Sequence, residues 1–194
     1  MPETPLILAS SSPFRRELLE RLHLPFRCQS PDIDESLQPG EKAVDYVQRL
    51  AREKARVIAE REPDALVIGS DQCALLDGEI LGKPGNPERA LQQLRQTQGK
   101  EVVFHTGLCV LQGSSGFEAV DCIDFRVGFR QRSDAQLRHY LEVEQPWGCA
   151  GSFKSEGYGI TLFRYLRGDD PTALVGLPLI RLTEMLEQAG LEVL

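Results

Sequence analysis

The stretch Leu66-Val67-Ile68-Gly69-Ser70-Asp71-Gln72 places an apolar run directly before a hydroxyl, a carboxylate and an amide. The run Leu66 to Ile68 contains two β-branched residues, which is typical of a strand buried on both faces. The pattern predicts that this strand ends at Gly69. Because ligands of open α/β sheets lie beyond the carboxyl ends of strands, Asp71 is a candidate metal ligand or general base. The alternative is that Asp71 only begins a turn.

The composition is that of an ordinary globular protein. Hydrophobic residues make up 41% and charged residues 26% of 194 residues, which predicts one domain spanning 1–194. The net charge of −7 argues against nucleic acid and anionic membranes as partners. Five scattered cysteines without a C-x-x-C pair support neither a disulfide framework nor a zinc site. With no leader-like segment and no run of 18 apolar residues, we expect a cytoplasmic protein.

A helix is predicted to begin directly after a first strand at residues 6–9. Ser12 has the character of an N-cap and Pro13 that of the first helical residue. The N-terminus of such a helix offers backbone N–H groups and a positive dipole end to an anion. Arg15 and Arg16 oppose that dipole, so we expect them to serve a phosphate. The alternative is that both are solvated surface charges.

An acidic loop follows the second predicted strand at residues 25–29. Asp32, Asp34 and Glu35 place three carboxylates within four residues, which suits a hard divalent cation such as Mg²⁺ or Mn²⁺. An acidic surface loop without a metal is the alternative.

The clearest helical periodicity covers residues 42–61, with Lys54 in the middle of the apolar face. Two interpretations of Lys54 remain open. Its ammonium either extends to the rim of the core or reaches a ligand above the strand ends.

The second half of the chain alternates strands, turns and helices. Asp77-Gly78 predicts a hairpin, and Lys83 follows it in a turn-rich segment. The glycine-rich stretch 149–159, which contains Lys154 and Glu156, is either a floppy loop or a ligand-binding one. The remaining predicted elements are a helix at 87–97, one strand or two at 101–111 with an interruption near 106–107, a strand at 125–130, a helix begun by a capping box at Ser133, an extended segment at 160–166 and a helix at 179–189.

The charged residues in unusual places predict a small, highly charged anion as ligand. A polyphosphate fits, because Lys and Arg neutralise phosphate and a carboxylate-bound metal takes the remaining charge. Hydrolysis by metal-activated water is favoured over covalent catalysis, because no nucleophile has a basic partner. The candidates are Ser10, Arg15, Arg16, Lys54, Lys83 and Lys154 for phosphate, with the carboxylates Glu35, Asp71 and Glu156.

The same residues lie in motifs that closely resemble the Maf family of nucleoside-triphosphate pyrophosphatases. The motifs cover nearly the whole chain: residues 8–16, Gly69-Ser70-Asp71-Gln72, Gly82-Lys83-Pro84, Thr106-Gly107, residues 152–157 and Val175-Gly176-Leu177-Pro178. The resemblance implies an α/β fold of the kind shared with inosine triphosphatases. In it, a mixed twisted sheet with flanking helices forms two lobes around a central cleft.

The resemblance also implies metal-dependent cleavage between the α- and β-phosphates of a nucleotide. It implies that Asp71 activates water and that Glu35 helps to hold a divalent Mg, Mn or Co ion, together with Asp71. Ser10, Arg15, Lys54 and Lys83 would hold the triphosphate.

Three positions point within the family to the YceF-like branch, which is linked to 7-methyl-GTP. These are Phe14, Gln72 and Glu156, where the pyrimidine-triphosphate branch usually has Arg, Thr and Gln. The YceF-like branch often has Trp in place of Phe14, so this position departs from its pattern. The alternatives are a pyrophosphatase for other nucleotides, of the dTTP and UTP type, and a non-catalytic regulator of septum formation. A homodimer is also an expectation.

Overall fold

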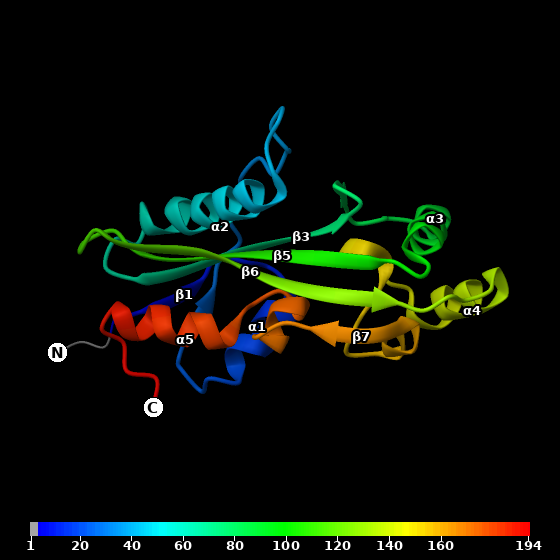
Figure 1. The fold of residues 1–194 in the computed structure, drawn as a ribbon. Helices are drawn as coiled ribbons and strands as arrows, with labels where there is room; N and C mark the ends of the chain where they lie inside the picture. Colours follow the sequence, from blue (N-terminus) through cyan, green and yellow to red (C-terminus); the bar gives the residue numbers. More distant parts are fainter. Residues whose placement is uncertain (1–3) are drawn as a thin grey trace. The chain divides into compact units, whose positions relative to one another are not determined.

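The computed structural model describes residues 4–194 and contains a mixed sheet with helices packed on it (Figure 1). The strand order is β2-β1-β3-β5-β6-β7, and β4 pairs with β3. β1 is parallel to β2 and β3, whereas β4 and β7 are antiparallel to their partners. The predicted α/β class with a mixed sheet is therefore confirmed. The strands are β1 (Leu6–Leu8), β2 (Arg27–Cys28), β3 (Leu66–Leu76), β4 (Glu79–Leu81), β5 (Glu101–Gln112), β6 (Phe117–Phe129) and β7 (Phe163–Arg167). The helices are α1 (Pro13–Glu20), α2 (Ala43–Ala59), α3 (Pro87–Thr97), α4 (Asp134–Glu144) and α5 (Leu179–Gln188), with 3₁₀ turns η1 (Ala150–Ser152), η2 (Tyr158–Leu162) and η3 (Pro171–Val175).

The chain divides into two compact units, and the division falls within β3, β5 and β6. Unit 1 comprises Met1–Asp71, Thr106–Ile123 and Thr172–Leu194. Unit 2 comprises Gln72–His105 and Asp124–Pro171.

Unit 1 consists of three layers, with α2 on one face of its strands and α1 and α5 on the other (Figure 1). Because side chains alternate along a strand, Leu8 packs with α1 and α5 while its neighbour Ile7 packs with α2. The same alternation places Ile68 on one face and Val67 on the other. Burial on both faces explains the uninterrupted apolar runs of these strands.

Two glycines let α2 lie unusually close to the sheet. A Cβ added at Gly69 would lie 2.0 Å from the Ala51 carbonyl oxygen, and one at Gly107 would lie 2.1 Å from that of Val47. Such distances exclude any side chain at either position. β5 runs through Gly107 without a break, so of the two alternatives for residues 101–111 the single strand is confirmed and the interruption near 106–107 is wrong. The glycine there permits helix packing and does not end a strand.

The predicted end of the central strand at Gly69 is also wrong. β3 continues to Leu76, which places Asp71 inside a strand. Its parallel neighbour β1 ends at Leu8, which pairs with Ile68. Asp71 therefore lies just past the carboxyl end of β1, and the rule for ligand sites in α/β sheets applies to that neighbouring strand.

Local capping signals locate the helix starts as predicted. Ser12 accepts a hydrogen bond from the Arg15 N–H, and Ser133 forms a reciprocal capping box with Gln136. The hairpin between β3 and β4 turns at Asp77 and Gly78, whose φ angles of 51° and 86° match the predicted tight turn.

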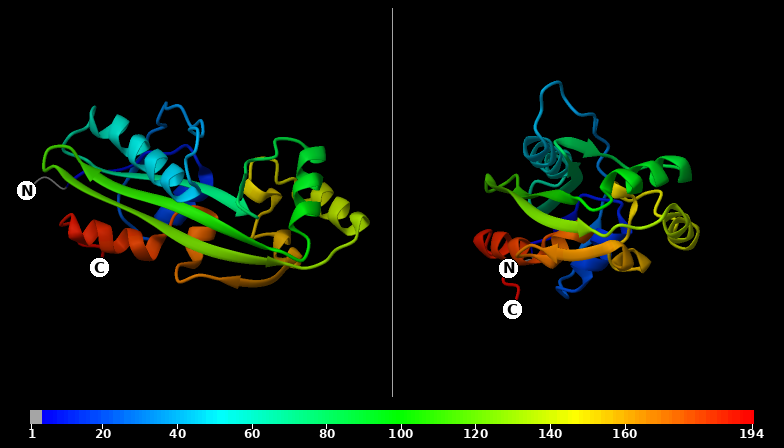
Figure 2. Two further views of the ribbon diagram at one scale, coloured as in Figure 1. Left: turned by 45° about the horizontal axis from the view of Figure 1, so that its top comes forward. Right: turned by 45° about the vertical axis from the view of Figure 1, so that its right-hand side comes forward.

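Unit 2 has an aromatic core. Phe153 makes edge-to-face contacts with Phe104, Phe129 and Phe163, with ring centroids 4.8–5.6 Å apart. Helices α3 and α4 pack against one another in this unit (Figure 2). The segment predicted to be extended from residue 160 is a 3₁₀ turn up to Leu162, so β7 is shorter than expected. A local hydrogen bond from the Thr161 hydroxyl to the Tyr158 carbonyl supports that turn.

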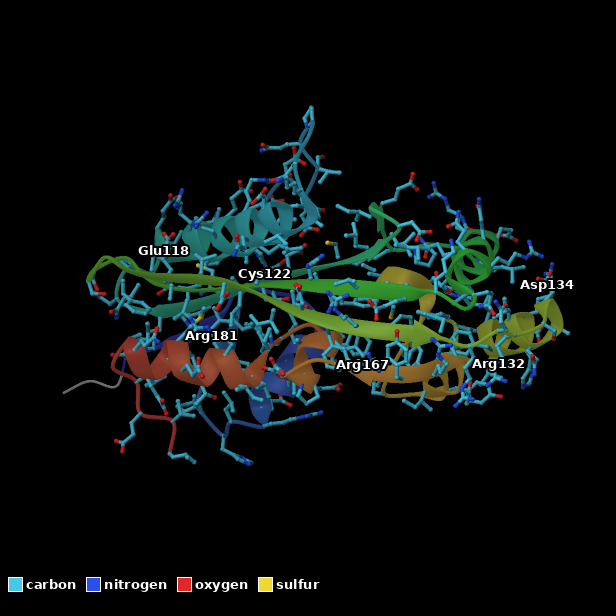
Figure 3. All side chains as sticks on the ribbon, viewed as in Figure 1. Glu118, Cys122, Arg132, Asp134, Arg167 and Arg181 are labelled. Atoms are coloured by element: carbon cyan, nitrogen blue, oxygen red, sulfur yellow. The ribbon has the colours of Figure 1, made fainter. Side chains whose placement is uncertain are left out.

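Several ion pairs on the surface of unit 1 join one element to another. Glu118 on β6 contacts Arg52 of α2 at 2.7 Å, and Arg181 of α5 contacts Asp121 at 2.7 Å (Figure 3). Such exposed pairs contribute little to stability. Within residues 4–194 no helix is long and apolar enough to cross a membrane.

Candidate active site

Two carboxylates and an ammonium meet in unit 1. Lys54 Nζ lies 2.6 Å from Asp71 Oδ1 and 2.7 Å from Glu35 Oε1. Lys54 and Asp71 are buried, whereas the side chain of Glu35 is about half exposed. A buried charge is tolerated where it is paired and hydrogen-bonded, and this cluster meets that condition.

The close packing of α2 explains how a lysine comes to lie there. Lys54 follows Ala51 by one helical turn on the face that packs against β3. Because Gly69 lets this face approach the strand, the ammonium reaches Asp71, two residues further along β3. The Lys54 ammonium is therefore held between two carboxylates of the protein and does not extend into solvent. Tyr46 holds the backbone of Glu35, because its hydroxyl donates to the Glu35 backbone carbonyl at 2.9 Å.

Arg15 lies beside the same carboxylates. Its Nε donates to the Gly176 carbonyl at 2.8 Å. Burial lowers the pKa of the Arg15 guanidinium, and the nearby Asp71 and Glu35 carboxylates act in the opposite direction. An arginine with a lowered pKa still stays protonated at neutral pH. Among residues 4–194 the hydrogen bond that Arg15 donates from its side chain uses Nε, and its two terminal nitrogens have no hydrogen-bond partner. Arg15 thus presents a fixed cation with two donor groups available.

The other candidates on α1 differ in exposure. Ser10 is buried, and its hydroxyl oxygen accepts the Ser12 N–H at 3.1 Å. Phe14 is half-buried. Arg16 is exposed and pairs with Glu20, one turn later on the helix. The neighbouring arginines therefore have different surroundings, Arg15 among carboxylates and Arg16 on the solvated face.

The candidates of unit 2 are more exposed. Lys83 is exposed in the segment after β4, and Gln72 is half-buried on β3. Lys154 is half-buried, and its Nζ donates to the Glu144 carbonyl at 3.0 Å. Glu156 is exposed and accepts the Ser155 hydroxyl at 3.0 Å.

The glycine-rich stretch that carries Lys154 and Glu156 is folded against the end of α4. Glu144 accepts the Tyr158 N–H at 2.6 Å and also lies 3.3 Å from Lys154 Nζ. A Cβ at Gly159 would lie 2.2 Å from the Lys154 backbone carbonyl oxygen, so this position requires glycine. These contacts order the stretch around Glu144, so the floppy interpretation is wrong and ligand binding by this stretch stays a prediction.

Two residues with positioning contacts were missed from the sequence. Glu144 organises residues 154–158, and Ser70 donates to the carbonyls of Gly107 and Gly176 at 2.9 and 3.0 Å. The signal for Ser70 was a hydroxyl beside Asp71 in a strand buried on both faces. No comparable signal existed for Glu144, since it resembles any acidic residue at the end of a helix.

Glu35 and Asp71 are of the type that holds a hard divalent cation. Their carboxylate oxygens each approach the same nitrogen within 2.7 Å, so both already point into one region. Mg²⁺ and Mn²⁺ prefer such oxygen ligands. The side chains therefore fit a divalent metal by their chemistry and by their convergence.

The chain also matches a family of known proteins. The model of the family described as Maf-like protein matches residues 5–189, and the chain belongs to this family. Its curated relatives include proteins named 7-methyl-GTP pyrophosphatase. The protein of that name from Pseudomonas aeruginosa is 57% identical over 193 residues, covering 100% of both chains. Those from Pseudomonas syringae pv. tomato and Nitrosococcus oceani are 56% and 58% identical, over 97% of this chain and 98% and 95% of theirs. The predicted resemblance to the Maf family and its 7-methyl-GTP branch is confirmed.

Proposed function

We propose that this chain hydrolyses 7-methyl-GTP to 7-methyl-GMP and pyrophosphate. The names of relatives that match its full length support the substrate. The observation that carries the chemistry is the buried Lys54–Asp71 pair, with Glu35 at 2.7 Å from the same ammonium and Arg15 nearby. Charges of this density are costly to bury, and a polyphosphate with its metal gives them a function.

Asp71 is the proposed proton acceptor for the attacking water. Its carboxylate is held by Lys54 in a strand, so its position is well defined. Glu35 and Asp71 would hold the divalent cation Mg²⁺, Mn²⁺ or Co²⁺, which when bound neutralises phosphate charge and makes water a better nucleophile. Arg15 and Lys54 neutralise charge on the phosphates, and Ser10 offers a hydroxyl at the start of α1.

Lys83, Lys154 and Arg16 complete the proposed phosphate-binding set. Lys154 is the best supported of these, because its ammonium is oriented by Glu144. Lys83 is supported by its place in the Gly-Lys-Pro motif and by its exposure. Arg16 has the weakest support, since it already pairs with Glu20.

Recognition of the methylated base is assigned to Phe14, Gln72 and Glu156. Methylation of the imidazole nitrogen of guanine makes the ring cationic, and a cation is attracted to an aromatic face such as that of Phe14. The Watson–Crick edge of guanine presents two adjacent N–H donors, which the carboxylate of Glu156 accepts better than an amide does. Gln72, next to Asp71, adds a contact that disfavours pyrimidines.

We further propose that residues 1–194 act as one Maf-like domain in the cytoplasm, with the free nucleotide as partner and with homodimer formation. The family match from residue 5 to residue 189 supports the single domain. The net charge of −7 supports a small nucleotide with its metal over a nucleic acid or a membrane surface.

Pyrophosphate release tests the proposal directly. Purified protein is assayed with 7-methyl-GTP, GTP, UTP and dTTP, each with Mg²⁺, Mn²⁺ and Co²⁺ and with EDTA as control. We expect kcat/KM for 7-methyl-GTP to exceed that for UTP by at least ~10-fold, and EDTA to abolish turnover. Equal rates for all four substrates would refute the preference for 7-methyl-GTP and indicate a general nucleotide pyrophosphatase. No release from any of them would favour the septum regulator.

A further inference from the structure

Ser70 is a buried hydroxyl that the proposed chemistry does not use. Its side chain is fully buried on β3, directly before Asp71. Its Oγ lies 2.9 Å from the Gly107 carbonyl oxygen and 3.0 Å from that of Gly176. A hydroxyl has one proton, so it is shared between the two carbonyls.

The Gly176 carbonyl has a second donor, which is Arg15. The Nε of Arg15 lies 2.8 Å from the same oxygen that Ser70 contacts. Gly176 has a φ of 118°, in a region that favours glycine, and its N–H closes the η3 turn on Ala173. The direction of this carbonyl is therefore set by a glycine conformation and by two side-chain donors.

The orientation of the Arg15 guanidinium follows from that carbonyl. With Nε bound to Gly176, the plane of the guanidinium is fixed, and its two terminal nitrogens remain for a ligand. A planar guanidinium binds phosphate best when both terminal donors approach at a set angle.

We propose that Ser70 is a positioning residue for polyphosphate binding, acting through the Gly176 carbonyl on Arg15. The inference rests on the proposed function, because it assigns Arg15 to the phosphates. It adds a residue that touches neither the phosphates nor the water. The Ser70–Gly176–Arg15 relay connects strand β3, the residue after η3 and helix α1. Ser70 and Gly176 are 106 residues apart in sequence, and Gly176 and Arg15 are 161 residues apart.

Thr106 supplies a matched control on the neighbouring strand β5. Its side chain is also fully buried, and its Oγ1 donates to the Ala173 carbonyl of η3 at 3.0 Å. It therefore stabilises the same segment with the same chemistry, through a carbonyl that Arg15 does not contact. Ser70→Ala and Thr106→Val each remove a hydroxyl and leave the rest of the side chain largely unchanged.

The test measures binding of inorganic pyrophosphate by calorimetry with Mg²⁺, and kcat/KM for 7-methyl-GTP, in Ser70→Ala, Thr106→Val, Arg15→Ala and the double variant Ser70→Ala/Arg15→Ala. Thermal melts report folding. We expect Ser70→Ala to weaken pyrophosphate binding about fivefold and to lower kcat/KM by a similar factor. In the Arg15→Ala background the same change should alter either quantity by less than about twofold. Thr106→Val should lower the melting temperature as Ser70→Ala does, with pyrophosphate affinity within about twofold of wild type.

Two results would overturn the relay. One is an equal loss of pyrophosphate affinity in Ser70→Ala and Thr106→Val, which assigns Ser70 to general stability. The other is an undiminished effect of Ser70→Ala when Arg15 is already absent. Failure of the proposed function looks different, because wild-type protein would then release no pyrophosphate from nucleotides while the binding measurements still test the relay.

Discussion

The charged residues of unit 1 and those of unit 2 are held in different ways. In unit 1 the side chains of Lys54 and Asp71 are 6% and 12% exposed and contact each other. In unit 2 Lys83 and Glu156 are exposed, and Lys154 is oriented by the end of α4. Lys54 and Asp71 thus lie on a helix and a strand and are buried between them, whereas Lys83 and Glu156 lie on segments between helices and strands.

This difference in burial predicts different effects of substitution on stability. A buried pair couples activity to stability, because removal of one partner leaves the other uncompensated. An exposed residue can change affinity with little effect on stability. We therefore expect substitutions of the buried pair Lys54 and Asp71 to change both kcat and the melting temperature, and substitutions of Lys83 and Glu156 to change kinetic constants alone.

The largest expected effect follows Asp71→Asn. An amide cannot accept the proton of the attacking water, so kcat should fall at least ~100-fold. The loss of a carboxylate beside Lys54 should also lower the melting temperature, and circular dichroism should show a preserved fold. Asp64→Asn, an exposed change close to the start of the same strand, is the control and should leave kcat unchanged. Near-normal turnover in folded Asp71→Asn would refute the assignment.

Lys54→Ala and Lys83→Ala compare the two units with one chemical change. Each should cost at least ~2 kcal/mol in transition-state stabilisation, as loss of a charge-assisted contact does. Only Lys54→Ala should also destabilise the protein, by about 3–5 kcal/mol, because Asp71 then stays buried without its ammonium. Steady-state kinetics and urea unfolding measure the two quantities. Comparable destabilisation by both substitutions would remove the distinction between the units.

What was predictable from sequence was set by local contacts. The starts of α1, α3 and α4 were predicted because a cap and its partner lie within three residues, as in Ser133 and Gln136. Charged residues in unusual places supplied most candidate site residues, and the resemblance to a family supplied their roles and added Phe14 and Gln72. The burial of Lys54 in the apolar face of α2 was visible in the periodicity, but its partners were not.

The failures have tertiary causes. Gly69 was interpreted as the end of a strand, and a break near Gly107 was left open, yet both are glycine because α2 lies against them. Nothing within a few residues of either glycine reveals that helix. The Ser70 relay is missing from the sequence interpretation for the same reason, since Gly176 is 106 residues away.

Glu156→Gln tests specificity in unit 2. The amide is isosteric but accepts the two N–H donors of guanine poorly, so kcat/KM for 7-methyl-GTP should fall about tenfold. UTP offers a different edge, and its kcat/KM should change by less than about twofold. The melting temperature should stay constant, because Glu156 is exposed and accepts a hydrogen bond from its neighbour Ser155. An equal fall for both substrates would make Glu156 a structural residue and remove the main physical support for recognition of the methylated purine.

The smallest effect is expected for Arg16→Ala, and it is informative because Arg15 is its neighbour. Arg16 is exposed and pairs with Glu20, whereas Arg15 is bound to Gly176 beside two carboxylates. Exposed pairs on one helix face contribute little, and an arginine in a first turn opposes the helix dipole, so the melting temperature should change by no more than about 1 °C. If Arg16 contacts phosphate as proposed, Arg16→Ala should raise the KM for 7-methyl-GTP about two- to threefold. Arg15→Ala should lower kcat/KM by at least ~10-fold.

Raising the ionic strength should reduce the effect of Arg16→Ala more than that of Arg15→Ala, because solvent-exposed charges are screened more strongly. Kinetics at two salt concentrations measure this difference. An unchanged KM at both would assign Arg16 to the solvated surface, and an effect as large as that of Arg15→Ala would show that burial does not separate the two arginines.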